Sequence, residues 1–350
     1  MQNKSIDQNN TNENNSKKRV NHFKTQEGKA TFRTRLISSV VLLLILALYI
    51  TSGALYTYLN EVSNFIIWSY LSIIFTMIIC AFGSYEINKA TGFKKWYYQV
   101  ILISLALVLY IFPITTKLYN FSFYLEMNLY SWLQPWHFAL FLSLSTLIYV
   151  ILGAIEYKNI AIKNTLINLL FNFIIIIAMK TYSIVSLDLL DSKTPMFSFN
   201  TILWIWVMII LGDSFAYIGG MSWGKTKLAP KISPKKSWEG AGFGLTIAFL
   251  FGIGYVAIFY FIPSLNSFKP LNVGIESLNK PIIEFLIYVL LAAIFPIIGL
   301  FGDLAFSWVK RVVNIKDYSN LIPGHGGVLD RLDSIIISLF VLFFIVISIG

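Results

Sequence analysis

The chain has 350 residues, of which 57% are hydrophobic and 13% are charged, and its formal net charge is +10. A soluble domain has roughly 25% charged residues, so this composition excludes an ordinary soluble protein and predicts an integral membrane protein. Lys and Arg orient polytopic proteins in the bilayer, so the positive charge is no sign of nucleic-acid binding. The single cysteine, Cys80, excludes a disulfide within the chain.

Residues 1–35 are polar, rich in Asn and Lys, and nearly free of large apolar side chains. Such a segment cannot bury enough apolar surface to fold, so we expect a disordered basic tail. The apolar stretches that follow must be helices, because lipid offers the backbone no hydrogen-bond partners. The sequence therefore predicts an all-α polytopic membrane protein with about nine transmembrane helices, at residues 36–59, 64–82, 98–115, 135–155, 164–183, 200–219, 241–261, 281–300 and 334–350.

The distribution of positive charge among the loops predicts the orientation of these helices. With the N-terminus in the cytoplasm, the segments on that side hold 22 of the chain's 27 lysines and arginines, which is a strong positive-inside bias. We therefore expect a plasma-membrane protein with an external C-terminus and a site on the cytoplasmic face. The site motifs lie after residue 200, so we divide the chain into the tail 1–35, an N-terminal membrane domain 36–199 of about five helices, and a C-terminal catalytic membrane domain 200–350 of about four helices and two cytoplasmic loops.

Two acidic residues are predicted to lie at membrane depth. Asp213 lies near the end of the sixth stretch, where an ionisable group costs about 2.5–3.5 kcal/mol and usually faces a polar cavity. The alternative is an aspartate at the membrane interface. The eighth stretch holds Pro296, Gly299 and Gly302, which predict a broken helix that lines a polar cavity. Asp303 follows directly and would lie in that cavity.

Residues 219–240 form a loop in which five lysines alternate with Gly, Pro and Ser. Lysine ammonium groups neutralise phosphate oxygens, and small residues let backbone N–H groups approach them. Residues 233–237 lie directly before the seventh helix, whose N-terminal dipole would favour an anion. The alternative is a positive-inside anchor on anionic lipid. On the phosphate interpretation, the candidate ligands are Lys225, Ser233, Lys235, Lys236 and Ser237.

The stretch 307–333 combines acids, cations and glycines between two apolar segments. Asp330 and Asp333 are three residues apart at the start of the ninth helix, so we expect them to face one side. Carboxylate oxygens of this kind suit Mg²⁺, which usually takes one or two carboxylates plus substrate phosphates. The alternative is a loop with ordinary turn glycines and topogenic charges.

The same stretch offers several groups for phosphate binding. Its glycine-rich turn at 324–327 can place backbone N–H groups against a phosphate. For His325 we favour a phosphate contact or a role in the turn over catalysis, because a phosphate nucleophile is already ionised near neutral pH. The phosphate-binding candidates of the stretch are Lys310, Arg311, Lys316, His325, Gly326, Gly327 and Arg331.

At these residues the chain resembles the phosphatidate cytidylyltransferases, also called CDP-diacylglycerol synthases. Their signature runs from Ser through Lys-Arg, Lys-Asp and His-Gly-Gly to Asp-Arg-aliphatic-Asp, and residues 307–333 match it at every position. Residues 213–240 resemble the family as well, at Asp213, Ala216, Tyr217, Gly220, Gly224, Lys225 and 233–240. Two positions depart from the pattern: Met221 stands where an Arg is expected, and Phe306 where a Glu is expected.

The resemblance implies transfer of CMP from CTP to phosphatidic acid, which gives CDP-diacylglycerol and pyrophosphate for phospholipid biosynthesis. It implies that Asp303 and Asp330 are catalytic and bind Mg²⁺, that Asp333 and Asp213 complete the site, and that Lys236 is catalytic by neutralising phosphate. One or two divalent ions, or an additional monovalent cation, fit this interpretation. The implied partners are CTP, phosphatidic acid and the bilayer, without nucleic acid, and a homodimer is left open. The alternatives are a CTP-dependent kinase of a polyprenol-type lipid and a membrane transporter.

Overall fold

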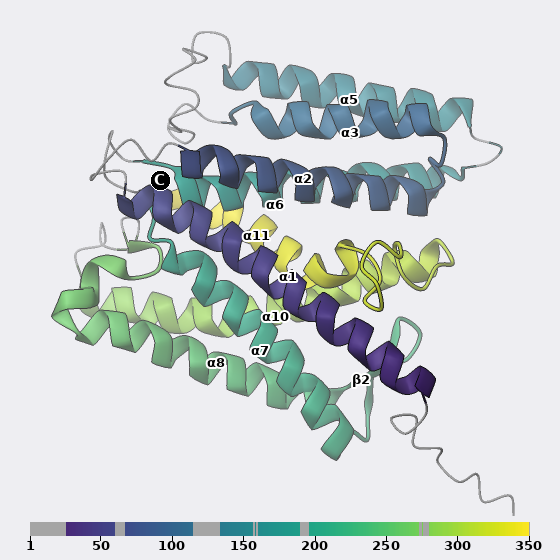
Figure 1. Cartoon of the computed structure of the whole chain (residues 1–350). Coiled ribbons are helices and arrows are strands. Elements are labelled where there is room, and N and C mark those ends of the chain that lie inside the picture. Colours follow the sequence, from purple (N-terminus) through teal and green to yellow (C-terminus); the bar gives the residue numbers. More distant parts are fainter. Residues whose placement is uncertain are drawn as a thin grey trace, which may run out of the picture.

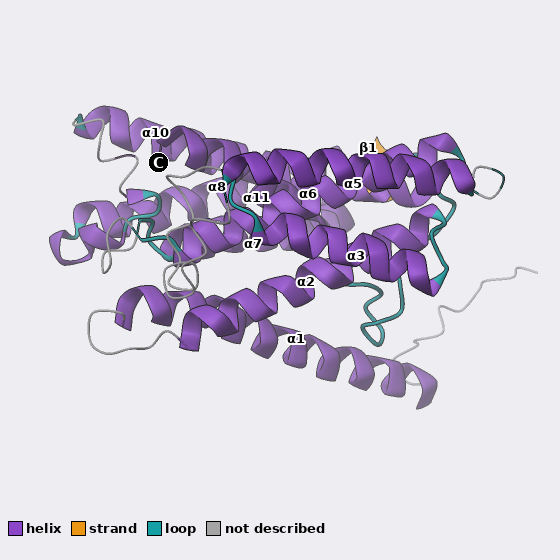
Figure 2. Ribbon diagram, turned by 90° about the horizontal axis from the view of Figure 1, so that it is seen from above, coloured by secondary structure: helices purple, strands orange, loops and turns teal. Residues whose placement is uncertain are grey.

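The computed structural model describes residues 26–59, 67–114, 134–156, 158, 160–189, 196–272, 275 and 280–349. Within them, the chain forms a bundle of long helices with a short β-hairpin at one end (Figure 1), and α1 lies along an outer face of the bundle (Figure 2). The elements are α1 (Gln26–Leu59), α2 (Ile67–Thr91), α3 (Trp96–Ile111), α5 (Pro135–Ile155), α6 (Ile162–Leu187), α7 (Asn200–Trp223), β1 (Lys227–Ala229), β2 (Ser233–Ser237), α8 (Trp238–Phe261), the 3₁₀ helix η3 (Pro263–Phe268), α10 (Pro281–Val312) and α11 (Leu329–Ile349).

The predicted all-α membrane architecture is confirmed, because a helix covers most of the described part of each of the nine apolar stretches. Among the described residues, eight helices are long and apolar enough to cross a membrane. The remaining one, α3, has 16 residues, fewer than the about 20 that a bilayer core requires. The predicted tail was wrong at its end: α1 begins at Gln26, so residues 26–35 are helical. Residues 1–25 of that tail lie outside the described residues.

The predicted break in the eighth helix is also wrong, because α10 is continuous through Pro296. The glycines that suggested a break permit close packing instead. A Cβ atom at Gly302 would lie 3.0 Å from the Cα atom of Ser334 on α11, and one at Gly299 would lie 3.2 Å from the side chain of Ile209 on α7. These glycines therefore bring α7, α10 and α11 together beside the candidate site.

Both C-terminal helices extend beyond the predicted spans and carry site residues. Because α10 continues to Val312, Asp303, Ser307 and Lys310 lie on it at spacings of four and three residues. Residues at these spacings share one face of a helix. The last helix, α11, begins before the predicted span, so Asp330 lies in its first turn.

The segments that the charge distribution assigns to the cytoplasm gather at one end of the bundle. In Figure 1 the β-hairpin and the loop 313–328 lie there, together with the start of α1, the turn between α2 and α3, and the end of α5. The C-terminus lies at the opposite end. This arrangement agrees with the expected topology, whereas the side of the membrane that each end faces stays a prediction.

The helix α6 lies at the centre of the bundle, where it packs against α2 and α11. Polar side chains join it to α2: the side-chain oxygen of Asn88 accepts hydrogen bonds from the amide nitrogens of Asn168 and Asn172, both at 3.0 Å. Polar groups within a bilayer must find partners inside the protein, so this cluster fixes how the two helices pack. The contact between α6 and α11 crosses the expected domain boundary at residue 200, and that boundary stays a prediction.

Small residues bring α7 and α8 into close contact. A Cβ atom at Gly240 would lie 2.5 Å from the carbonyl oxygen of Ala216, and one at Gly244 would lie 2.3 Å from the carbonyl oxygen of Gly212. Helix backbones in membranes approach this closely only where side chains are small. This contact fixes α7 and the start of α8, which together flank the candidate site.

We expect Gly244→Ala to destabilise the protein by about 1–3 kcal/mol, because the added methyl group overlaps the α7 backbone. Gly242→Ala is the matched control, since a Cβ atom at Gly242 meets no atom within 4 Å. The midpoint of thermal unfolding in detergent should fall for Gly244→Ala and stay near the wild-type value for Gly242→Ala. Equal midpoints for the two variants would show that α7 and α8 do not touch as closely as the structure indicates.

Candidate active site

The lysine-rich loop folds as a short antiparallel hairpin that the sequence did not predict. Glu239 lies in the first turn of α8 and holds the segment that leads into the hairpin. Its carboxylate accepts hydrogen bonds from the backbone N–H groups of Lys225 and Thr226. The hydroxyl of Ser237 accepts a hydrogen bond from the N–H of Gly240 at 3.2 Å and so caps α8. These contacts fix β2, and with it the lysines at 235 and 236, relative to α8.

A cavity of about 710 Å³ lies between α7, the hairpin, α10 and α11. Its volume is within the range of small-molecule sites. Four aspartates and five cations line it, so the two charged loops and both acids predicted at membrane depth meet around one space. The predicted site residues on this lining are Asp213, Ser233, Lys235, Lys236, Ser237, Asp303, Lys310, Asp330, Arg331 and Asp333.

Two ion pairs join the elements around the cavity. Lys236 on β2 pairs with Asp303 on α10 at 2.5 Å, and the hydroxyl of Ser307 donates a hydrogen bond to the other oxygen of Asp303 at 3.0 Å. Lys310 on α10 pairs with Asp330 on α11 at 2.8 Å. The four charged side chains are 5% to 25% exposed, so salt screens these pairs less than it screens surface pairs.

Asp330 is hydrogen-bonded through both of its carboxylate oxygens. Its Oδ1 accepts from Lys310, and its Oδ2 accepts from the backbone N–H groups of Tyr318 and Gly327, both at 2.9 Å. The hydroxyl of Tyr318 donates to the carbonyl oxygen of Phe306 at 3.0 Å. Burial, together with the nearby charge of Asp330, raises the pKa of the Tyr318 phenol, so this hydroxyl remains a donor at neutral pH. The loop 313–328 is thus hydrogen-bonded to both α10 and α11.

Asp213 and Asp333 extend the acidic part of the cavity. Ser334 connects them, because its hydroxyl donates to Asp213 at 3.2 Å and its backbone N–H donates to Asp333 at 2.8 Å. Asp333 also lies within electrostatic reach of Asp303. In the part of the chain that the structure describes, no three His, Cys, Asp or Glu side chains form a group that could hold a metal by themselves. One or two of these aspartates would still suffice for Mg²⁺ with substrate phosphates.

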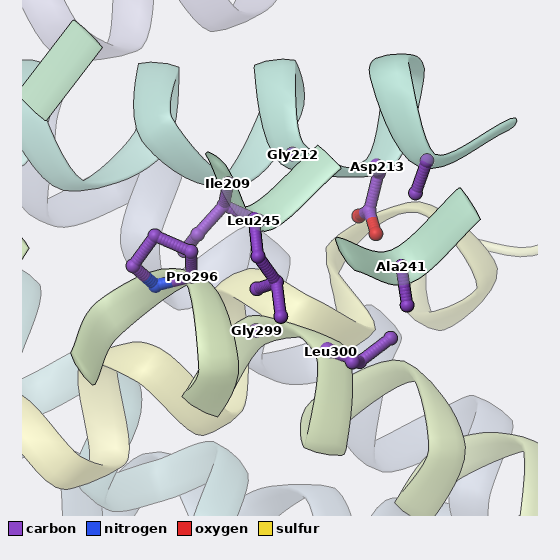
Figure 3. A pocket seen from close by; sticks show the side chains of 9 residues that line it. Ile209, Gly212, Asp213, Ala241, Leu245, Pro296, Gly299 and Leu300 are labelled. Carbon is purple, nitrogen blue, oxygen red and sulfur yellow. The ribbon is translucent and has the colours of Figure 1, made fainter. Parts of the chain in front are cut away.

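A narrow apolar crevice adjoins the cavity between α7, α8 and α10. Ile209, Leu245 and Pro296 lie toward one end of it, and Asp213 lies toward the other (Figure 3). Asp213 and Leu300 line both the crevice and the cavity. The site therefore combines a charged part beside the loops with an apolar part among the helices.

Six predicted site residues do not line the cavity: Lys225, Arg311, Lys316, His325, Gly326 and Gly327. Arg311 instead supports the hairpin, since its Nε donates to the carbonyl oxygen of Ile232 at 3.1 Å. The N–H of Gly327 is used by Asp330, and Lys316 is exposed to solvent. Direct contact between these six residues and a phosphate stays a prediction.

His325 joins the glycine-rich turn to α1. Its Nδ1 lies 2.8 Å from the hydroxyl of Ser38, and its Nε2 lies 3.1 Å from that of Ser39. Since Ser38 donates its own proton to the carbonyl of Thr34, we assign the tautomer in which Nδ1–H donates to Ser38 and Nε2 accepts from Ser39. The carbonyl oxygen of His325 accepts two hydrogen bonds from Arg331, at 2.9 and 2.7 Å. Of the two roles predicted for His325, the geometry favours turn structure.

We expect His325→Ala to lower stability by about 1 kcal/mol, because two side-chain hydrogen bonds to α1 are lost. The activity implied by the resemblance should fall by less than about tenfold, since Arg331 still binds the backbone. The Ser38→Ala/Ser39→Ala double variant removes the same bonds from the other side and should behave alike. Thermal unfolding and initial rates check this; a hundredfold loss of rate at unchanged stability would instead assign His325 to the chemistry.

The two departures from the family pattern lie in different surroundings. Phe306 is fully buried, with its ring centroid 5.0 Å from that of Phe171 and 6.0 Å from that of Tyr318. It therefore belongs to the packing behind the cavity. Met221 lines the cavity and is 65% exposed, as is Tyr217 one turn earlier on α7. The rim is thus apolar where the family pattern suggests a cation.

Three residues around the site were missed by sequence reasoning. Lys227 lines the cavity, and its only signal was its place in the lysine-rich loop. Ser334, which bridges two aspartates, looked like an ordinary residue at the start of the last helix. Glu86 lies on α2 and accepts hydrogen bonds at the start of α11. No motif pointed to it, because the contact depends on how distant helices pack.

Residues 33–349 match the sequence profile of the cytidylyltransferase family. A phosphatidate cytidylyltransferase from Rickettsia felis is 48% identical to the chain over 135 residues, which cover 38% of this chain and 52% of that protein. One from Haemophilus influenzae is 37% identical over 174 residues, or 49% of this chain and 54% of that protein. One from Brucella abortus is 37% identical over 155 residues, which cover 44% of this chain and 49% of that protein. The chain thus spans about half the length of the curated relatives it matches.

Proposed function

The chain belongs to the cytidylyltransferase family, and on this basis we propose that it transfers CMP from CTP to phosphatidic acid, forming CDP-diacylglycerol and pyrophosphate. Relatives that match it are named for phosphatidate cytidylyl transfer. The observation that carries the proposal is the 710 Å³ cavity, where five cations and four carboxylates meet. Such a mixture suits two phosphate-bearing substrates and a divalent cation.

In the two ion pairs, lysines and aspartates of the site neutralise one another. Lys236 pairs with Asp303, and Lys310 pairs with Asp330. A triphosphate that enters the cavity offers the lysines several charged oxygens at once. We therefore propose that each lysine exchanges its carboxylate for a phosphate oxygen when CTP binds. This exchange fills the site with nucleotide and leaves the carboxylates available for another cation.

The carboxylates of the cavity fit Mg²⁺ as hard oxygen ligands. Asp303, with Asp213 or Asp333 beside it, provides the one or two carboxylates that Mg²⁺ usually takes. Asp330 can join them through Oδ1, which accepts a single hydrogen bond, from Lys310, and becomes more open once Lys310 has moved to phosphate. When bound, the ion would neutralise phosphate charge and orient the triphosphate.

In the proposed reaction, a phosphate oxygen of phosphatidic acid attacks the α-phosphorus of CTP. A new P–O bond forms as the bond from the α-phosphorus to the α–β bridging oxygen breaks, and pyrophosphate leaves with that electron pair. The nucleophile is already ionised, so no side chain has to remove a proton. The protein positions the two substrates and neutralises their charge. The cations on the cavity lining that can neutralise phosphate charge include Lys235, Lys236 and Arg331.

The apolar helix surface around the crevice suits the lipid substrate, whereas the crevice itself, at about 10 Å³, has no room for an acyl chain. The crevice adjoins the cavity at Asp213 and Leu300 and is lined mainly by apolar side chains. The exposed side chains of Tyr217 and Met221 add an apolar rim on α7. We propose that phosphatidic acid enters from the bilayer with its phosphate in the charged part, while CTP enters from the cytoplasm. The hairpin end of the bundle must then face the cytoplasm, as the positive-inside bias predicts.

Product analysis with purified protein in vesicles that contain phosphatidic acid tests the proposal. CTP labelled in its α-phosphate should pass the label to lipid, with one pyrophosphate released for each CDP-diacylglycerol. Chelation of divalent ions should stop this transfer, and added Mg²⁺ should restore it. CDP and a phosphorylated lipid as products would instead establish a CTP-dependent lipid kinase. Movement of a solute across the membrane without CTP turnover would establish a transporter.

A further inference from the structure

Glu86 lies on α2, far from the signature in sequence, and its side chain is fully buried. Its carboxylate accepts hydrogen bonds from the hydroxyl of Ser319 at 2.5 Å, from the N–H of Val328 at 2.9 Å and from the N–H of Leu329 at 2.8 Å. A buried ionisable group within a membrane protein needs such partners, because an unpaired charge away from water is costly. All three donors belong to the segment that leads to Asp330.

The N–H groups at the start of α11 and just before it are divided between two carboxylates. The first N–H groups of any helix have no acceptor within that helix. The N–H of Gly327 donates to Asp330. The N–H groups of Val328 and Leu329 donate to Glu86. Leu329 and Asp330 are adjacent in the chain. The hydrogen bond from the N–H of Leu329 to Glu86 therefore also limits the direction of the Asp330 side chain.

The turn approaches α2 closely at Gly327. A Cβ atom at this position would lie 2.5 Å from Oε1 of Glu86, so a larger residue would displace either the turn or the carboxylate. Glu86 therefore holds the turn from the side of α2, while Asp330 holds it from α11. The position of the turn depends on both carboxylates.

We infer that Glu86 is a positioning residue, which fixes the turn before α11 so that Asp330 stays aligned with Lys310. Glu86 does not line the cavity, so it acts through Asp330 and not on a substrate. The expected effect on turnover rests on the proposed function, whereas the effect on the turn does not. Through α2, the N-terminal half of the chain then takes part in shaping the site.

The test compares two changes of buried polar groups on α2, Glu86→Gln and Asn88→Ala. Glutamine keeps the size of the side chain, but its amide nitrogen replaces one carboxylate oxygen. That nitrogen cannot accept the hydrogen bonds that Ser319, Val328 or Leu329 donates to Glu86. Asn88 is hydrogen-bonded to Asn168 and Asn172 on α6. Both variants disturb a buried network, and Glu86→Gln alone removes contacts with the turn.

Hydrogen–deuterium exchange of peptides covering residues 318–332 is the first measurement. Glu86→Gln should speed exchange at Val328 and Leu329, and Asn88→Ala should leave it at the wild-type rate. Turnover is the second measurement, at a temperature where both variants remain folded. In Glu86→Gln, kcat should fall about 10–100-fold with little change in KM for CTP. Losses of this size are found when a residue that hydrogen-bonds to a metal-ligating side chain is changed. Asn88→Ala should keep a kcat near that of the wild type.

Each other outcome has a definite meaning. Unchanged exchange in Glu86→Gln would overturn the inference, and so would faster exchange with an unchanged kcat. Equal losses of kcat in Glu86→Gln and Asn88→Ala would assign Glu86 to general packing. If Glu86→Gln does not fold, Ser319→Ala removes one of the three bonds and should shift both measurements in the same direction. A wild-type protein that makes no CDP-diacylglycerol would refute the proposed function, and the exchange data would still decide whether Glu86 holds the turn.

Discussion

Lys236→Ala should lower kcat/KM for CTP by about a hundredfold or more, the scale seen when one charge-stabilising group is removed from an active site. Lys236 lines the cavity and pairs with Asp303 at 2.5 Å, with its side chain 21% exposed. The substitution removes a cation that would neutralise phosphate. It also leaves Asp303 without its partner, and the unpaired carboxylate repels the incoming triphosphate. Initial rates of CDP-diacylglycerol formation over a range of CTP concentrations measure the effect.

Lys231→Ala is the matched control for this variant. Lys231 lies in the turn of the same hairpin, is exposed, and does not line the cavity. Both variants remove one positive charge from the same loop, so their effects on membrane insertion should be equal. Small and equal changes in kcat/KM for the two variants would mean that these lysines serve topology alone.

Asp330→Asn should lower activity by about a hundredfold or more, because an amide can neither neutralise Lys310 nor ligate a divalent cation as a carboxylate does. The amide nitrogen would also face either Lys310 or the N–H groups of Tyr318 and Gly327, which now donate to Asp330. Loss of one partner from a buried ion pair costs about 3–5 kcal/mol of stability. Thermal unfolding must therefore be measured beside the rate.

Two further variants separate chemistry from stability. Asp330→Asn/Lys310→Met removes both charges of the pair, so it should recover stability without recovering activity. Asp317→Asn changes an exposed acid of the same signature that does not line the cavity, and it should retain activity. Near-full activity in correctly inserted Asp330→Asn would exclude this residue from the chemistry. An equally large loss in Asp317→Asn would show that the cavity does not define the site.

The helices could be predicted from sequence because the bilayer leaves the backbone few alternatives. Their ends could not, since a helix that continues into water has no apolar signal, as at the start of α1 and the end of α10. The expected break in α10 was wrong for a different reason. Composition does not distinguish a glycine that weakens a helix from one that permits close packing, and Gly302 is of the second kind.

The sequence also predicted that the lysine-rich loop and the signature form one site, and in the structure residues of both line one cavity, where Lys236 of the loop pairs with Asp303 just before the signature. It could not show the direction of each side chain. Arg311 is adjacent to Lys310, yet it contacts the hairpin turn outside the cavity. Glu86 was invisible because its role depends on contact between α2 and the start of α11, which no local pattern records.

Protection of a cysteine on the lining decides whether this cavity binds CTP. Ser233→Cys places a thiol there, and the natural Cys80 is fully buried. Leu321→Cys is the control, because Leu321 is 44% exposed and does not line the cavity. In vesicles that expose the cytoplasmic face, CTP with Mg²⁺ and without phosphatidic acid should slow labelling at position 233 by a membrane-impermeant thiol reagent, and leave labelling at 321 unchanged. Labelling at 233 that saturating CTP does not slow, in protein that still makes CDP-diacylglycerol, would contradict the assignment.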